Sequence, residues 1–167
     1  MRCLRLTCVI GALAAGALAL TGCGTTGSDS PFGTFPGLGP STPAEVPARY
    51  TAEEIVGRWG VASYQKEADR ARTEAAARKA CGKPYTIGKG QGGGVMMHLP
   101  GQTAAQELRL KGSVDGKTFV GPAGEAGGVQ DREIVSFDGR VLVLRYVEQE
   151  TAGRFGTMVY VRCAPRA

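Results

Sequence analysis

Beyond residue 84 the chain consists of short runs in which apolar and polar residues alternate, each separated from the next by turn residues. Such runs predict β-strands, and they cover residues 85–87, 95–99, 107–111, 117–120, 132–137, 140–148 and 156–163. Asp115-Gly116 and Asp138-Gly139 are typical of two-residue hairpin turns. With one more strand expected at 58–64, the sequence predicts a mainly β protein. The expected form is a small antiparallel β-barrel of about seven or eight strands, or a strongly curved sheet.

One segment has the composition of a helix. Residues 65–81 are rich in Ala, Arg, Lys and Glu and are followed by Gly82, which favours a helix end. We therefore expect one α-helix inserted after the first strand, with the small side chains of Ala68, Ala71 and Ala75 packed closely on the barrel. The helix also carries an excess of basic side chains, so anionic lipid or polysaccharide is an alternative partner for it.

Two of the expected strands indicate what lies on either side of them. Both faces of 140–148 are apolar, which predicts a central strand covered on both sides. In 157–163, Val159 and Val161 share a face with Cys163. The other face carries Met158, Tyr160 and Arg162.

The N-terminus has the three parts of an export signal. Arg2 and Arg5 precede an uncharged apolar run, residues 6–20, which is too short for a comfortable membrane span. Leu20-Thr21-Gly22-Cys23 follows and resembles the lipobox of bacterial lipoproteins. The resemblance implies that residues 1–22 are removed and that Cys23 is lipidated and attached to a membrane. Gly24 stands where Asp is the usual inner-membrane retention residue, so we expect the inner leaflet of the outer membrane, facing the periplasm.

Residues 23–49 are predicted to be a tether. Five of the nine prolines fall there, at positions 31, 36, 40, 43 and 47, with Gly, Ser and Thr between them. Such a composition cannot bury enough apolar surface to fold by itself. The folded domain is therefore expected to comprise residues 50–167.

The cysteines fit an exported protein. Cys3 and Cys8 would leave with the signal and Cys23 would carry lipid, so Cys81 and Cys163 remain in a compartment where disulfides persist. Neither a CxxC motif nor a second histidine supports a redox or metal site. We expect one disulfide between Cys81 and Cys163, which would stabilise the domain by ~4 kcal/mol in the loop-entropy description.

Gly57-Arg58-Trp59 resembles the Gly-x-Trp motif on the first strand of lipocalins and related calycin barrels. In that superfamily an Arg late in the last strand packs over the Trp and closes the barrel, and Arg162 stands at the corresponding place. The resemblance implies that Trp59 and Arg162 form a barrel-closing pair. Stacking between them is favourable because a planar guanidinium is attracted to the face of an indole. The resemblance is limited to these end motifs and the number of strands. The helix inserted after the first strand is a difference from the family. Small bacterial protease inhibitors share the barrel and a first-strand Trp, but their disulfide lies elsewhere.

Several chemistries lack the residues they need. The glycine-rich segment 88–94 has neither the spacing of a phosphate-binding loop nor a following helix, so it and 121–128 are expected to be flexible loops at the barrel rim. His98 is the single histidine, which argues against zinc. No set of acid, base and nucleophile can be assembled. We therefore expect no enzymatic activity, no metal and no cofactor. Export of the protein, and the lack of aromatic residues between the basic residues of the helix, argue against nucleic acid as a partner.

The sequence predicts a non-catalytic binding module, a lipid-anchored barrel that holds a small apolar ligand or a protein segment. A structural or assembly lipoprotein of the envelope, or a barrel of the protease-inhibitor kind, is the alternative. An open apolar pocket would favour a ligand, whereas a filled interior would favour surface contacts with an envelope protein.

Overall fold

A computed structural model describes residues 45–163 of the chain. The predicted signal 1–22, the lipidation of Cys23 and most of the tether 23–49 lie outside the described residues and stay predictions.

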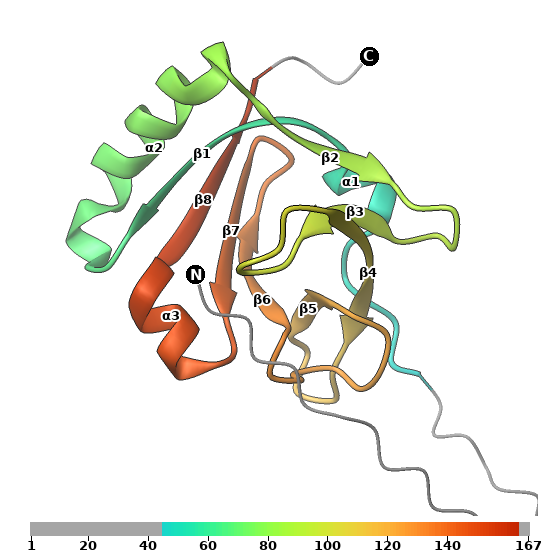
Figure 1. Cartoon of the computed structure of the whole chain (residues 1–167). Coiled ribbons are helices and arrows are strands. Elements are labelled where there is room, and N and C mark those ends of the chain that lie inside the picture. Colours follow the sequence, from blue (N-terminus) through green and yellow to red (C-terminus); the bar gives the residue numbers. More distant parts are fainter. Residues whose placement is uncertain (1–44, 164–167) are drawn as a thin grey trace, which may run out of the picture. The chain divides into compact units, whose positions relative to one another are not determined.

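Eight antiparallel strands form a closed barrel in which each strand pairs with the next and β8 returns to β1 (Figure 1). They are β1 Gly57–Tyr64, β2 Tyr85–Lys89, β3 Val95–His98, β4 Ala105–Gly112, β5 Thr118–Gly121, β6 Arg132–Phe137, β7 Val141–Tyr146 and β8 Thr157–Arg162. The prediction of a mainly β, small antiparallel barrel is confirmed.

Within residues 45–163, three α-helices and two short 3-10 turns accompany the strands. The short helix α1, Ala52–Ile55, begins at a capping box between Thr51 and Glu54 and precedes β1. The expected helix after the first strand is present as α2, Arg70–Lys79, between 3-10 turns at Glu67–Asp69 and Ala80–Gly82. The third helix, α3 Gln149–Phe155, connects β7 to β8 and was not predicted.

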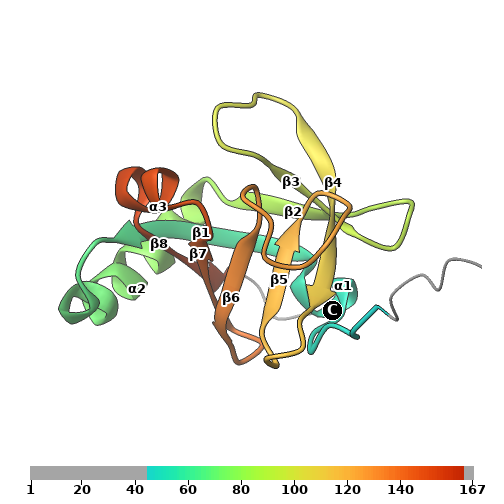
Figure 2. The same cartoon turned by 90° about the horizontal axis from the view of Figure 1, so that it is seen from below.

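Helix α2 lies outside the barrel along β1 and β8 (Figure 2), but on a face that differs from the predicted one. Ala68, Ala71 and Ala75 are exposed, whereas Ala77 is fully buried. A Cβ added at Gly60 of β1 would lie 1.9 Å from the Ala77 carbonyl oxygen, so the helix backbone touches the strand directly. Alanines occur on every side of this helix, so they do not indicate which side packs on the barrel. The side that packs is the one in line with Cys81.

Strand β7 is buried on both faces, as expected, since Leu142, Val143 and Leu144 are all buried, and β8 also has core on both sides. Leu142 and Leu144 of β7 are buried in the main core inside the barrel with Tyr160 of β8. Val159 and Val161 point the other way and form a second core with Ala77 of α2. These strands are therefore shielded from water by the barrel interior and, for β8, by the helix.

Residues before Tyr50 already belong to the barrel domain. The Val46 carbonyl accepts a hydrogen bond from the Gly112 amide at 3.2 Å, and the Arg49 amide donates to Thr118 Oγ1 at 3.1 Å. The domain therefore extends upstream of the predicted start at residue 50, to Val46 at least.

A buried ion pair fixes the connection between β5 and β6, residues 122–131. Lys111 Nζ, from the outer side of β4, donates to Asp131 Oδ1 at 2.7 Å and to the carbonyls of Pro122 and Glu125 at 3.0 and 2.9 Å. Asp131 Oδ2 accepts from two loop amides, each at 2.9 Å. The glycine-rich segment expected to be a flexible loop is instead fastened to the barrel wall at both oxygens of one carboxylate.

Candidate functional site

The predicted barrel-closing pair lies at one end of the barrel. Trp59 and Arg162 face each other across the β1–β8 ladder, and Arg162 Cζ lies 4.1 Å from the centre of the Trp59 ring. Trp59 is fully buried, and its indole N–H donates to the Ile55 carbonyl at 2.9 Å. The structure thus brings the two residues together in a cation–π contact.

Arg162 also donates hydrogen bonds to three carbonyl oxygens on two segments around this end. Its acceptors are the carbonyl oxygens of Gly139 at 2.8 Å, Val56 at 3.0 Å and Glu54. Gly139 belongs to the turn between β6 and β7, while the other two flank the end of α1. Because the guanidinium lies over the indole and binds these carbonyls, this end of the barrel is closed.

The disulfide between Cys81 and Cys163 is present, with 5.4 Å between the two Cα atoms. It joins the 3-10 turn that follows α2 to the residue after β8, as the shared face of Val159, Val161 and Cys163 indicated. The disulfide therefore pins the end of the helix against the last strand.

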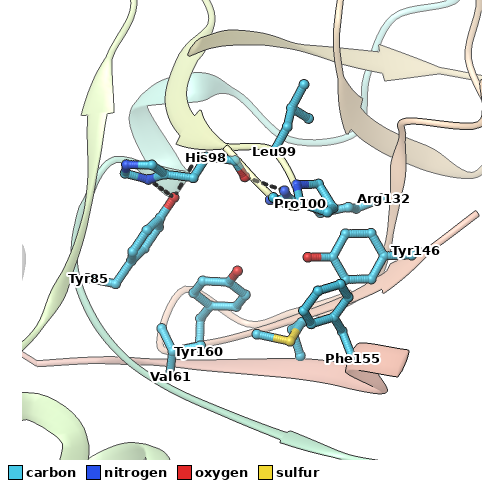
Figure 3. Close-up of a pocket in the computed structure, with 11 residues that line it drawn as sticks. Val61, Tyr85, His98, Leu99, Pro100, Arg132, Tyr146, Phe155 and Tyr160 are labelled. Atoms are coloured by element: carbon cyan, nitrogen blue, oxygen red, sulfur yellow. Dashed lines mark hydrogen bonds between the residues drawn. The ribbon is translucent and has the colours of Figure 1, made fainter. Parts of the chain in front are cut away.

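A cavity of about 270 Å³ lies at the opposite end, where β3 and β7 finish and β6 and β8 begin. Figure 3 shows its lining, in which aromatic and apolar side chains converge from five elements. The bulky side chains among them are Tyr85 of β2, Tyr146 of β7, Phe155 of α3, and Met158 and Tyr160 of β8. The barrel is therefore sealed at one end and hollow at the other.

Arg132, the first residue of β6, is the charged residue of this lining. It is 2% exposed, and its guanidinium lies 5.0 Å from the centre of the Tyr146 ring. Its Nη2 donates to the His98 carbonyl oxygen, whereas its buried Nε has no hydrogen-bond partner within residues 45–163. No sequence motif marks Arg132, although its alternation with the buried Ile134 places it on the inner face of the strand.

Two phenols share this cavity with Arg132. Tyr160 is 5% exposed, and burial raises the pKa of its hydroxyl far above the ordinary value, with the charge of Arg132 acting in the opposite direction. Tyr160 is therefore a neutral hydroxyl at physiological pH. The Tyr146 hydroxyl points into the same space (Figure 3).

His98 lies at the rim of the cavity and is exposed. Its Nδ1 is 3.2 Å from the Tyr85 hydroxyl oxygen, which also accepts a hydrogen bond from the His98 amide at 2.9 Å. The pair holds the ends of β2 and β3 together. Within the described residues, no three His, Cys, Asp or Glu side chains approach closely enough to hold a metal ion.

Helix α3 brings Phe155 to the cavity. The Glu148 carboxylate accepts from the amides of Glu150 and Thr151 at 2.9 and 2.6 Å and so caps the helix N-terminus. Hydrogen bonds from Thr151, side chain and amide, and from the Glu150 amide lower the pKa of Glu148. At the other end Gly156 has φ 72°, which favours glycine and ends the helix. Glu148 and Gly156 are the signals from which this short helix could have been predicted.

The glycine-rich loop 88–94 binds a carboxylate of the chain itself. Glu107 on β4 accepts from the Gly92 amide at 2.8 Å and from the Gly94 amide at 2.9 Å. These bonds, that from Gly94 first, lower the pKa of Glu107. The loop amides that a phosphate would need are thus already occupied.

Comparisons with protein-family models, curated proteins and solved structures find no match to this chain. No helix within residues 45–163 is long and apolar enough to cross a membrane. A function for this protein must therefore be argued from its own residues.

Proposed function

We propose that this protein is a non-catalytic binding module that holds a small apolar ligand in the cavity at the open end of its barrel. In this proposal the mature chain is attached through Cys23 to the inner leaflet of the outer membrane and presents the barrel to the periplasm. The observation that carries the proposal is the cavity itself, about 270 Å³ with aromatic and aliphatic walls.

The size of the cavity indicates the size of the ligand. An apolar cavity of ~150 Å³ suffices for benzene, and sites for drug-sized ligands span ~300–1,000 Å³. The cavity therefore suits a small molecule, or one end of a longer one. The rest of the interior is filled by buried side chains, among them Trp59, Ile87, Leu108 and Leu142.

The lining supports binding rather than catalysis. His98 and Arg132 are the polar groups besides the phenols, and no carboxylate or thiol accompanies them among the described residues that line the cavity. A nucleophile with its base would need a Ser, Cys, Lys or carboxylate side chain. The His98–Tyr85 pair instead links β2 to β3 at the rim of the cavity.

The likeness to lipocalins supports the same proposal. Lipocalins are barrels closed at one end, and here Arg162 lies over Trp59 of the Gly-x-Trp motif at the closed end. The hollow lies at the other end, where a calycin-type barrel would receive a ligand.

Native mass spectrometry of the full-length protein, purified from its own membrane, tests the proposal. We expect an additional small-molecule mass on the wild type, lost in Met158→Trp, which fills the cavity. Val114→Trp is the matched control, because Val114 is 96% exposed and distant in sequence from the lining. If the wild type carries no ligand and also fails to bind any of octanoate, 1-octanol and octylamine added in solution, the proposed function is wrong.

A further inference from the structure

The cavity contains a buried cation for which the described residues supply no carboxylate. Arg132 is 2% exposed, and of its five N–H donors only those on Nη2 have an acceptor, the His98 carbonyl oxygen. Its buried Nε lacks a hydrogen-bond partner in the part of the chain that the structure describes. A neutral carbonyl and the face of Tyr146 do not balance the charge of the guanidinium.

The neighbouring carboxylates are bound to other partners. Asp131 accepts from Lys111 Nζ at 2.7 Å and from the loop amides outside the barrel wall. Glu133 points away from the interior and pairs with Arg145 at 2.8 Å. Arg132 is thus left as the charge that faces the cavity, and a buried charge without a counter-ion is costly.

Two further donors lie around the same space. The hydroxyls of Tyr160 and Tyr146 both point into the cavity beside Arg132 (Figure 3), and neither has a hydrogen-bond partner among the described residues. Phenol hydroxyls and a guanidinium are donors suited to an acceptor-only group. Behind them, Val61, Phe155 and Met158 supply an apolar wall.

We propose that the ligand is a small monocarboxylic acid, whose carboxylate binds Arg132 and the phenols of Tyr146 and Tyr160 and whose apolar body fills the rest of the cavity. This inference rests on the proposed function and narrows its ligand class. A planar carboxylate can accept two parallel N–H bonds from the edge of a guanidinium. A ligand amine would meet the charge of Arg132 and be repelled.

Three ligands with the same chain length and different head groups distinguish the contribution of head-group charge to binding from that of the apolar body. Octanoate, 1-octanol and octylamine are titrated into the wild-type protein at pH 7, and binding is followed by calorimetry and by NMR of the aromatic side chains. We expect octanoate to bind about tenfold or more tightly than 1-octanol, and octylamine to bind most weakly. Equal or tighter binding of 1-octanol would overturn the carboxylate inference alone. Failure of all three to bind would overturn the proposed function as well.

A pair of variants tests the role of Arg132. Arg132→Gln is compared with Arg145→Gln, which removes an arginine from the outer side of the adjacent strand. We expect Arg132→Gln to lose about tenfold or more in octanoate affinity while its 1-octanol affinity stays unchanged, and Arg145→Gln to retain both. A folded Arg132→Gln that binds octanoate as the wild type does would contradict the inference. If circular dichroism shows Arg132→Gln to be unfolded, the comparison of the three ligands on the wild type still tests whether the ligand is a carboxylate.

Discussion

Arg162 binds two segments at the closed end of the barrel, the end of α1 and the turn between β6 and β7, while its face lies on Trp59. The same contact explains the glycine of the Gly-x-Trp motif. A Cβ at Gly57 would lie 2.5 Å from Arg162 Nη1, so any larger residue would displace the guanidinium from its place. The glycine of the motif is therefore required to leave space for the Arg162 guanidinium.

Replacing this arginine tests the closed end. We expect Arg162→Ala to lower the free energy of unfolding by ~1–3 kcal/mol, because the indole loses its cation and three carbonyls lose a donor. Urea denaturation measures the loss. Arg58→Ala on the exposed side of the same β1 strand is the control and should stay within about 0.5 kcal/mol of the wild type. Equal effects of the two substitutions would show that the stack contributes nothing.

The buried Lys111–Asp131 pair is a second residue-scale test. Asp131→Asn removes the negative partner and leaves the Lys111 ammonium buried, so we expect a loss of ~3–5 kcal/mol. Asp115→Asn, at an exposed ion pair with Lys117, is the matched control and should change stability by ~0–1 kcal/mol. Thermal unfolding followed by circular dichroism compares the two. An Asp131→Asn protein as stable as the control would contradict a structural role for the pair.

At the scale of elements, the strands were predictable because their signal is local. Alternation and Asp-Gly turns lie within a few residues of each other, and all eight strands fall on predicted runs. The phase of α2 was not predictable from its alanines, but counting back by fours from Cys81 gives Ala77 and Thr73, the two buried residues of the helix. Helix α3 was missed because seven residues are too few to show helical periodicity.

The cap of α3 predicts a pH dependence. The pKa of Glu148 is lowered in the folded protein. The stabilisation that the ionised Glu148 gives the helix is therefore complete at neutral pH. It is lost as the pH falls through the folded-state pKa, which lies below the usual range for Glu. We expect the amide proton resonance of Thr151 to shift with a midpoint below that of Glu in unfolded peptides. Glu148→Gln should abolish this titration. A wild-type midpoint at or above the ordinary Glu value would refute the cap.

At the scale of the whole molecule, the closed end could be predicted and the open end could not. Trp59, Arg162 and the cysteine pair were recognised because each belongs to a pattern that is visible in the sequence. The cavity is built instead from single residues on separate strands, among them Arg132, Tyr146 and Tyr160, and only the barrel brings them together. Its charge pattern depends on the pairing of Asp131 with Lys111, which lies 20 positions away in the sequence and which no local pattern shows.

The disulfide joins the end of α2 to the end of the barrel across 82 positions of sequence. We expect the Cys81→Ala, Cys163→Ala double variant to lose ~2–5 kcal/mol of stability, because the unfolded chain is released from a long closed loop. Chemical denaturation measures the difference. Two freely reactive thiols in native wild-type protein, detected by alkylation and mass spectrometry, would show that the bond does not form.

The attachment of the barrel to a membrane is the last prediction, and it rests on Leu20-Thr21-Gly22-Cys23. A single acyl chain gives marginal membrane binding, whereas several chains on one residue give stable attachment. We therefore expect the wild type in the membrane fraction, with an intact mass that begins at Cys23 and includes acyl groups. Cys23→Ser should appear in the soluble fraction without that increment, while Cys8→Ser, inside the predicted signal, should behave as the wild type. A wild-type mass that begins before Cys23 and contains no acyl group would remove the anchor, yet leave the barrel and its cavity as a soluble binding domain.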